Sequence, residues 1–360
     1  MKRLLPLKYL LPSIDVILVP ICLALIVSVL MLRSIAPSVF PQYYIYITFS
    51  VLFFAVFQKI EFDTLAAFSW ILYIGSIALL LLPIVIGEVT RGTIRWIPLG
   101  SFNLQPAEIV RPFLILFFSV YFGSQTITAM RLVKSLPLVL LPVAFIFLQP
   151  SLGVAIMTLA GCAGVIFSYG LRRKYIIWGI VLTIVSLPLL WLLLQPYQKT
   201  RVLSLLSPYS DPSGHGYNSI QSIIAVGSGK FSGRGLGNGV QTQLSFLPEK
   251  HTDFMFAAIS EELGFIGSTF VLAILGFLLY RLLNFASNEE SNVKKAFIIG
   301  VFCTLFLQIF VHVGMNMGML PITGLPLPLI SYGGSSLLST MITLGISLQV
   351  GKSSSKIQSI

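Results

Sequence analysis

Long runs of apolar residues, separated by short polar stretches, dominate this sequence from residue 14 onward. A helix of about 20 apolar residues is long enough to cross the hydrocarbon core of a bilayer. Proline interrupts several runs, which a membrane helix tolerates when neighbouring groups satisfy the freed backbone carbonyls. The pattern therefore predicts an all-α polytopic membrane protein with about ten spans, near residues 14–35, 42–57, 65–87, 107–123, 136–149, 151–168, 174–195, 256–283, 294–317 and 329–350.

Composition agrees with a membrane protein. Of the 360 residues, 56% are hydrophobic and 10% are charged, whereas a soluble domain carries about 25% charged residues. The net charge of +11 does not indicate nucleic-acid binding, because the basic residues are scattered between apolar runs. The basic N-terminus precedes an apolar run that is too long for a signal peptide, so we expect a retained first helix. The three cysteines lie in apolar runs, without metal-ligand spacing.

Charge predicts the orientation of the spans. Ten spans place both termini on one side; joining the fifth and sixth runs across Gln149-Pro150 would give nine. With the N-terminus inside, fourteen of the 23 Lys and Arg residues are cytoplasmic, and only four lie near short outer loops. We therefore expect an N-in/C-in protein. Seven of the twelve acids gather at the outer side, namely Glu88, Glu108, Asp211, Glu249, Asp253, Glu261 and Glu262. Acids near a membrane often mark function, so the outer side is where we expect the site.

One connecting segment is much longer than the others. We expect residues 196–255 to form a long extracytoplasmic loop with short helices of its own. Long loops in compact proteins are usually functional or disordered, so this loop is a candidate for function. Residues 1–351 are predicted to form a single integral membrane domain. The Ser-rich residues 352–360 are predicted to be a disordered cytoplasmic tail.

The strongest candidate for chemistry is the polar stretch that leads into the eighth span. Asp253 lies where the helix begins, and Glu261 and Glu262 lie more than two turns inside it. The alternative is that Thr252 or Asp253 is a simple N-cap and that Glu261 and Glu262 are ordinary polar positions of the helix. Two adjacent acids deeper in the helix need partners, water or a cation. We predict that Asp253 is a general base or an ion ligand in an outward cavity, with substrate contacts from Glu249, Lys250 and His251.

A second candidate stretch joins an interfacial loop to the fourth span. Trp96 is typical of the membrane interface, and Pro106 is suited to the first turn of a helix. Glu108 and Arg111 are three residues apart on one helical face. They can form a local ion pair that has no further role. The alternative is that Arg95 and Arg111 contact an anionic lipid headgroup, with Glu108 orienting them.

Two glycine-containing stretches complete the set. Residues 227–239 contain six glycines together with Lys230 and Arg234. They match no nucleotide motif, so a flexible loop and a pyrophosphate cradle both remain open. Residues 324–336 predict irregular backbone at the outer end of the last span, where Ser331 and Ser335 are candidate substrate contacts. We interpret His312, on the preceding span, as a satisfied core histidine.

The order and spacing of these stretches resemble the SEDS family (shape, elongation, division and sporulation), which contains RodA and FtsW. The matching residues are Arg95-Trp96-Ile, Gln105-Pro106-Ala-Glu108, Gln149-Pro150-Ser-Leu152-Gly153, 227–239, the stretch Leu247-Pro-Glu-Lys-His-Thr-Asp253-Phe, Glu261-Glu262-Leu-Gly264, 320–328 and 331–335. Ala107, Ser151 and His312 depart from the usual family pattern, as does Arg111, where lysine is common. The short N-terminal region and the near absence of a tail favour the RodA-like branch.

The resemblance implies a peptidoglycan glycosyltransferase of the bacterial cytoplasmic membrane. Such enzymes polymerise lipid II, an undecaprenyl-pyrophosphoryl disaccharide-pentapeptide, beside a class B penicillin-binding protein. The aspartate that it implies as catalytic is Asp253. Direct displacement needs a base for the acceptor hydroxyl and positive charge at the leaving pyrophosphate, for which the candidates are Arg95, Arg111, Lys230 and Arg234. The sequence assigns no cofactor. The open alternative is a divalent cation (Mg or Mn) that shares the neutralisation of the leaving pyrophosphate.

Two other classes of function fit parts of the pattern. Proline-broken helices and acids near the membrane also suit a flippase or transporter of a lipid-linked precursor. Transport needs groups across both leaflets, whereas the acids gather outside. A non-catalytic scaffold for a class B penicillin-binding protein is the third class.

Overall fold

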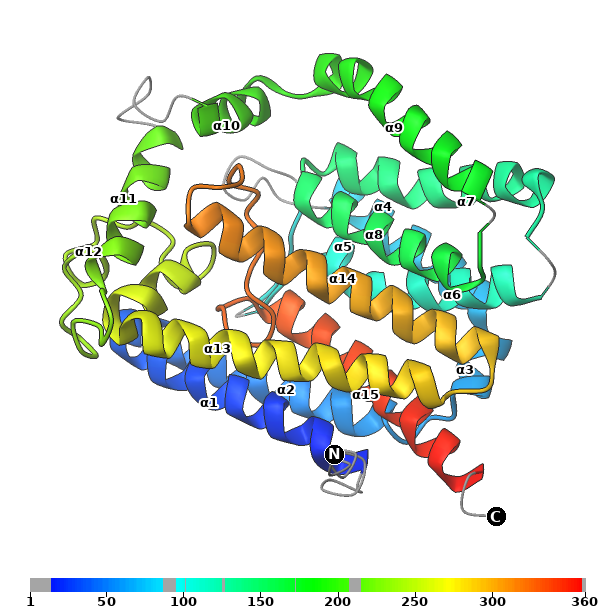
Figure 1. Cartoon of the computed structure of the whole chain (residues 1–360), viewed down its shortest axis with the longest axis horizontal. Helices are drawn as coiled ribbons and strands as arrows, with labels where there is room; N and C mark the ends of the chain where they lie inside the picture. Colours follow the sequence, from blue (N-terminus) through cyan, green and yellow to red (C-terminus); the bar gives the residue numbers. More distant parts are fainter. Residues whose placement is uncertain are drawn as a thin grey trace, which may run out of the picture.

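The computed structural model describes residues 14–86, 95–100, 102–124, 127–171, 173–206 and 215–357, so Glu88, Arg91 and Asp211 lie outside the described residues. Each of the ten expected spans is helical over most of its length (Figure 1). The corresponding elements are η2 (Ile14–Ile17) with α1 (Leu18–Ile35), η3 (Pro37–Val39) with α2 (Phe40–Phe57), α3 (Phe62–Ala67) with α4 (Ser69–Ile86), α5 (Pro106–Ile109) with α6 (Arg111–Gly123), α7 (Ala129–Leu148), α8 (Leu152–Ser168), α9 (Arg173–Leu193), α13 (Met255–Asn288), α14 (Asn292–Asn316) and α15 (Gly334–Ile357).

Length and apolarity qualify several of these helices to cross a membrane. Among the described residues, six do so: Leu18–Ile35, Pro37–Phe57, Pro106–Gly123, Ala129–Leu148, Met255–Asn288 and Asn292–Asn316. Two shorter apolar helices, Ser69–Val85 and Leu152–Ser168, lie beside them. Because much of the apolar surface of these helices faces outward, the chain is a multi-pass membrane protein.

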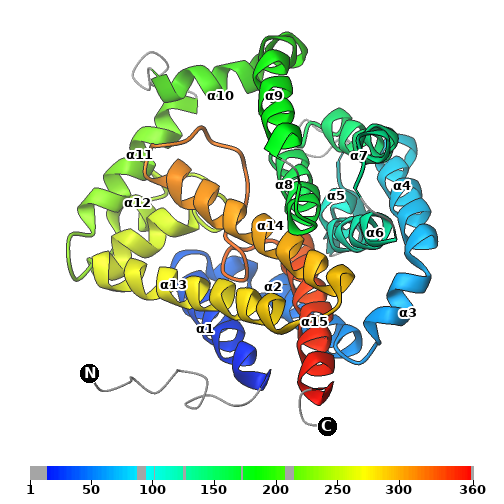
Figure 2. The ribbon, with the colours of Figure 1, turned by 45° about the vertical axis from the view of Figure 1, so that its right-hand side comes forward.

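The centre of the bundle is α14, which packs against α6, α8 and α13, while α15 packs along α2 (Figures 1 and 2). Glycine brings α8 and α14 close together. A Cβ on Gly161 would lie 2.7 Å from Thr304 Oγ1, and one on Gly164 would lie 2.7 Å from Cys303 Sγ. Small residues at such contacts let membrane helices approach until backbone and side chains pack tightly.

The two ends of the bundle are each held by contacts between segments distant in sequence. At one end, Lys294 Nζ pairs with Asp63 Oδ2 at 3.0 Å, and Tyr169 donates to the Ser119 carbonyl oxygen at 2.6 Å. At the other, the backbone N–H of Gln105 donates to Ser335 Oγ at 2.8 Å. Segments that the predicted topology assigns to one side of the membrane therefore lie together. We call the end that carries Asp253 the cavity end.

The structure adds features that the apolar pattern did not reveal. An antiparallel hairpin of two short strands, β1 (Ile97–Leu99) and β2 (Phe102–Leu104), lies between α4 and α5. All other regular elements of the described residues are helices, which confirms the predicted all-α class. The long loop contains α10 (Pro196–Leu206), α11 (His215–Ser228) and α12 (Val240–Gln243), as expected.

The prediction of a disordered tail is wrong for residues 352–357, because α15 continues to Ile357. Gly351 lies so close to the Phe285 ring that an added Cβ would be 2.9 Å from it. The Lys352 ammonium donates to Gln58 Oε1 at 3.5 Å. These contacts fix the helix where the predicted tail begins, at Gly351 and Lys352; residues 358–360 are outside the described residues.

Candidate active site

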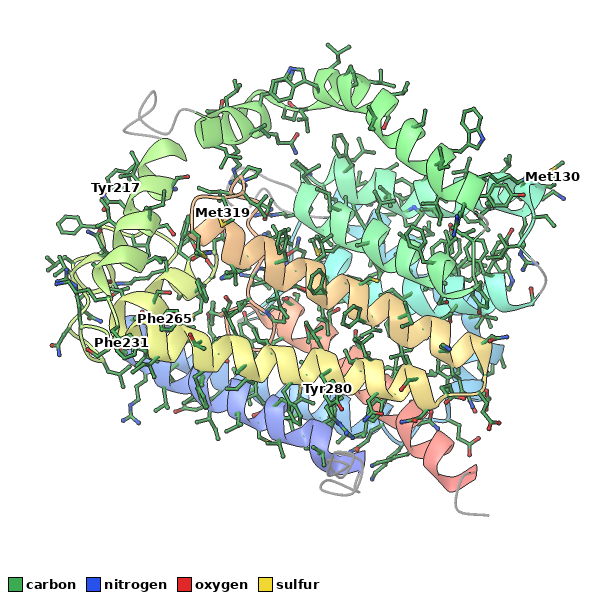
Figure 3. The ribbon with its side chains drawn as sticks, in the orientation of Figure 1. Met130, Tyr217, Phe231, Phe265, Tyr280 and Met319 are labelled. Atoms are coloured by element: carbon green, nitrogen blue, oxygen red, sulfur yellow. The ribbon has the colours of Figure 1, made fainter. Side chains whose placement is uncertain are left out.

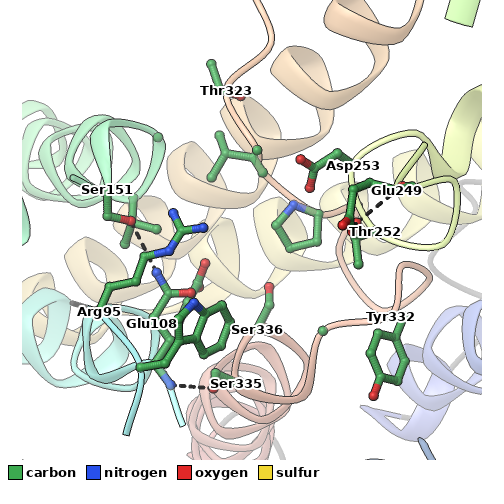
Figure 4. A pocket seen from close by; sticks show the side chains of 18 of the residues that line it. Arg95, Glu108, Ser151, Glu249, Thr252, Asp253, Thr323, Tyr332, Ser335 and Ser336 are labelled. Atoms are coloured by element: carbon green, nitrogen blue, oxygen red, sulfur yellow. Dashed lines mark hydrogen bonds between the residues drawn. The ribbon is translucent and has the colours of Figure 1, made fainter. Parts of the chain in front are cut away.

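A cavity of about 680 Å³ opens at the cavity end of the bundle. Its walls come from stretches that are far apart in sequence, around residues 39–46, 95–108, 150–154, 198–202, 249–253 and 321–336. Figure 4 shows Arg95, Glu108 and Ser151 on one side of it, Tyr332 on the other, and Asp253 beside Glu249 and Thr252. The four stretches singled out in the sequence do not all contribute, since residues 227–239 do not line the cavity.

Asp253 lies just before α13, and α14 holds this part of the backbone. Asn316 Nδ2 donates to the Asp253 carbonyl oxygen at 3.0 Å, and Asn316 Oδ1 accepts from the Ala257 N–H at 2.9 Å. His312 Nε2 accepts from the Phe256 N–H at 3.4 Å, while Nδ1 bonds the Leu325 carbonyl oxygen at 2.7 Å. His312 is thus a satisfied core histidine, as interpreted. Two free N–H groups of the first turn of α13 are bonded by α14, so capping of this turn does not require Asp253.

The irregular segment between α14 and α15 forms a wall of the cavity and packs directly against this backbone. Ser331 Oγ donates to the Thr252 carbonyl oxygen at 2.8 Å, and the Tyr332 N–H donates to the His251 carbonyl oxygen at 2.8 Å. Ser331 therefore supports the Asp253 segment and does not itself line the cavity. Non-helical backbone at membrane depth is stable only when such partners satisfy it.

Gly324 leaves the space in front of the Asp253 carboxylate. Its φ of +71° is a conformation that glycine adopts without strain. A Cβ at this position would lie 3.5 Å from Asp253 Oδ2 and 3.9 Å from Arg201 Nη1. The carboxylate and the guanidinium of Arg201 therefore approach the same glycine from two different elements.

Glu261 and Glu262 are fully buried and lie outside the cavity. The backbone N–H groups of Gln241 and Thr242, at the start of α12, donate to the two Glu261 carboxylate oxygens at 2.8 and 3.0 Å. Glu262 accepts from Ser34 Oγ at 2.6 Å and from Gln243 Nε2 at 2.9 Å. The two acids thus join α12 and α1 to α13, which gives them protein partners.

Lys250 belongs to the same cluster. Its ammonium donates to the Thr242 carbonyl oxygen. Burial lowers the pKa of this ammonium, and the negative charges of Glu262 and Glu261 oppose that shift. Lys250 does not line the cavity, and its positive charge interacts with the buried carboxylates of Glu261 and Glu262.

The glycine-rich stretch, residues 227–239, packs across a break in α13, and we call it the glycine-rich clasp. Gly264 has a φ of +68° and interrupts the helix. Across the break, the Arg234 N–H donates to the Glu261 carbonyl oxygen at 2.9 Å, and the Phe265 N–H donates to the Lys230 carbonyl oxygen at 3.0 Å. The ring of Phe231 stacks on that of Phe265 at 6.0 Å on the outside of the clasp (Figure 3). The glycines bring backbone against backbone, and neither Lys230 nor Arg234 reaches the cavity.

Glu108 and Arg111 form a buried ion pair, with Arg111 Nη2 and Glu108 Oε2 2.8 Å apart. Glu108 lines the cavity, whereas Arg111 lies behind it and also donates to Gln308 Oε1 at 3.4 Å. Arg95 lines the cavity itself and lies over the Trp96 ring, 5.8 Å from its centroid. Arg95 and Arg111 therefore do not line one headgroup site together.

Of the predicted site residues, the cavity lining includes Arg95, Glu108, Glu249, His251, Asp253 and Ser335, whereas it does not include Arg111, Lys230, Arg234, Lys250, Glu261, Glu262 and Ser331. Sequence reasoning missed Arg201 and the aromatic wall of Tyr46 and Tyr332, whose rings lie 5.6 Å apart.

The described residues form no group of three or more His, Cys, Asp or Glu side chains that could hold a metal ion. His251 Nε2 and Glu249 Oε2 lie 4.0 Å apart and do not form such a ligand set. We therefore assign no chemical step to a divalent cation.

Comparison with known proteins shows that the chain is similar to peptidoglycan glycosyltransferases. The family model FTSW_RODA_SPOVE, described as cell cycle protein, matches residues 6–356. The peptidoglycan glycosyltransferase MrdB of Escherichia coli (strain K12) is 40% identical over 286 residues, which cover 78% of this chain and 76% of MrdB. A probable peptidoglycan glycosyltransferase FtsW of Pseudoalteromonas translucida (strain TAC 125) is 38% identical over 290 residues, which cover 78% of this chain and 72% of that protein.

Solved structures give the same likeness. A chain from a study of how a peptidoglycan synthase complex coordinates polymerization and crosslinking is 31% identical, with a TM-score of 0.81, and the match covers 94% of this chain and 97% of that one. The crystal structure of the rod shape determining protein RodA of Thermus thermophilus is 26% identical with a TM-score of 0.71, covering 94% and 96%.

Proposed function

Since the chain belongs to the FTSW_RODA_SPOVE (SEDS) family and is a multi-pass membrane peptidoglycan glycosyltransferase, we propose that it polymerises lipid II into β-1,4-linked glycan strands on the outer face of the bacterial cytoplasmic membrane, with Asp253 as the general base. The observation that carries this proposal is the position of Asp253 on the wall of a large cavity that also presents arginine side chains. A cavity of about 680 Å³ lies within the range of about 300–1,000 Å³ that ligand sites occupy.

The reaction is a displacement with inversion at the anomeric carbon of the donor. The acceptor 4-hydroxyl oxygen forms the new bond to that carbon, the bond to the α-linked pyrophosphate breaks, and its electron pair leaves with the phosphate oxygen. The hydroxyl proton passes to the Asp253 carboxylate. A side chain within hydrogen-bond reach of the hydroxyl performs this step, and no covalent enzyme intermediate is required.

The contacts that position Asp253 suit the role of a general base. Asn316 and Ser331 hold the backbone on both sides of it at 3.0 and 2.8 Å. Gly324 keeps the space before its carboxylate open for a substrate hydroxyl. A base held by rigid neighbours loses little freedom when the acceptor arrives, which lowers the entropic part of the barrier.

A class B penicillin-binding protein is the partner that we propose for this chain. The support is the likeness to a chain of a peptidoglycan synthase complex studied for the coordination of polymerization and crosslinking. A transpeptidase beside the cavity would crosslink the emerging strand.

Asp253→Asn tests the base assignment, because it retains the size of the side chain and removes the basic carboxylate. The purified variant, assayed with its partner and labelled lipid II, is expected to lose glycan polymerisation by at least about a hundredfold, the lower range for loss of general-base catalysis. Asp63→Asn is the matched control, since Asp63 lies at the opposite end and its side chain is 76% exposed.

The same assay in sealed vesicles separates the classes of function. Glycan polymer in the wild type indicates the enzyme. Label that becomes protected without polymer would indicate a flippase, and neither result would indicate a scaffold. Turnover of Asp253→Asn close to that of the wild type would overturn the assignment of the base.

A further inference from the structure

Positive charge is scarce in the cavity. Among the described residues that line it, Arg95 and Arg201 are the only arginine or lysine side chains, whereas Glu108, Glu249 and Asp253 are its acids. Arg111 is committed to Glu108 from behind the wall. Among the described residues of the lining, Arg95 and Arg201 are therefore the cationic side chains that can neutralise a dianionic group in the cavity.

Arg201 reaches the cavity from an unusual element. Helix α10 belongs to the long loop, packs against α11 and lies above the bundle in Figures 1 and 2. Gln198, Arg201 and Val202 line the cavity from this helix, and their spacing of three and four residues defines one face of it. The side chain of Leu203, next in sequence, is 52% exposed. One face of α10 thus forms part of the cavity roof.

The end of the Arg201 side chain lies close to the reacting carboxylate. A Cβ on Gly324 would be within 4 Å of both Arg201 Nη1 and Asp253 Oδ2, so the two side chains border the same small space. A guanidinium in this position can contact the group that leaves the anomeric carbon while Asp253 contacts the group that attacks it. Arginine is suited to phosphate because its planar fork donates two parallel hydrogen bonds.

We propose that Arg201 binds the pyrophosphate of the lipid-linked donor and neutralises the charge that develops on it as the bond to the sugar breaks. Arg201 stays protonated throughout, and the only proton transferred is the one that Asp253 takes from the acceptor. This inference rests on the proposed function and replaces Lys230 and Arg234 as candidates for leaving-group charge. It also makes α10 the element that completes the donor site.

Binding of polyprenyl ligands tests the proposal without turnover. In full-length Asp253→Asn protein in lipid nanodiscs, the affinities for undecaprenyl pyrophosphate and undecaprenyl phosphate are measured with and without Arg201→Ala. We expect Arg201→Ala to weaken pyrophosphate binding about tenfold and monophosphate binding much less, because the second phosphate loses a charge-assisted contact. Lys199→Ala is the control, since Lys199 is on α10 but does not line the cavity.

A turnover measurement separates direct contact from support of the roof. In the otherwise wild-type enzyme, Arg201→Ala should lower kcat, and guanidinium ions should restore part of it, whereas Arg201→Lys should retain intermediate activity. Equal weakening of both ligands without guanidinium rescue would overturn the proposal, as would unchanged affinity. If folded Asp253→Asn protein bound neither polyprenyl ligand, the proposed function itself would fail.

Discussion

Glu108 and Arg111 show how position changes the meaning of a residue pair. Their three-residue spacing predicts a weak surface contact, worth a few tenths of a kcal/mol. In the structure both side chains are 3% exposed, and Ser339 Oγ donates to the Glu108 carbonyl oxygen at 2.6 Å. A buried carboxylate that loses its cation is strongly destabilising, so this pair links the cavity wall to the stability of the bundle.

Arg111→Met is therefore expected to lower the free energy of unfolding by about 3–5 kcal/mol, since it leaves the Glu108 carboxylate buried and unpaired. Thermal unfolding of the protein in nanodiscs measures the change. Arg33→Met, which removes an exposed arginine, is the control and should have little effect. Adding Glu108→Gln to Arg111→Met should recover much of the loss; a double variant no more stable than Arg111→Met would contradict the explanation.

At the scale of the elements, the glycine-rich clasp depends on backbone proximity. A Cβ on Gly229 would lie 1.7 Å from the Ser260 carbonyl oxygen, and one on Gly233 would lie 2.2 Å from that of Glu262. At Gly227, in the same stretch, an added Cβ would meet no atom within 4 Å outside the adjoining backbone of its own helix. The break in α13 and the loop therefore fit only while these two residues lack a side chain.

Gly229→Ala should consequently shift the loop away from α13 and destabilise the protein by at least about 1–3 kcal/mol, the usual cost of overpacking. Gly227→Ala is the matched control and should be neutral. Limited proteolysis within residues 227–239, together with thermal unfolding, reports the release of the clasp. Equal protease resistance of the two variants would show that the loop accommodates the added methyl group.

Local pattern predicted the elements better than it predicted the site. The spans were visible because apolar runs are a property of contiguous sequence. The role of the glycines was not visible, because it depends on Ser260 and Glu262, which approach only after α13 breaks at Gly264. The role of Arg201 cannot be predicted from local pattern for the same reason, since it depends on the nearness of Asp253, which is 52 positions later in the chain.

At the scale of the whole molecule, the cavity lies at the end of the bundle where irregular segments and the long loop gather. Stretches from six parts of the chain line it, and the contacts of Lys294 with Asp63 and of Lys352 with Gln58 join segments at the opposite end. An enzyme that uses substrates and releases polymer on one side needs this asymmetry. A carrier would have to open both ends in turn.

The proposed orientation follows from charge, and accessibility to a membrane-impermeant thiol reagent tests it. In a chain whose three native cysteines are replaced by alanine, Leu244→Cys places a thiol at the cavity end, at a position where the native side chain is 64% exposed. Glu290→Cys places one in the exposed turn between α13 and α14, at the opposite end. Because the basic residues of the short loops gather at that opposite end, it should face the cytoplasm. In intact spheroplasts, Leu244→Cys should be labelled at once and Glu290→Cys only after permeabilisation; the reverse order would place the cavity inside the cell, away from an outward site of polymerisation.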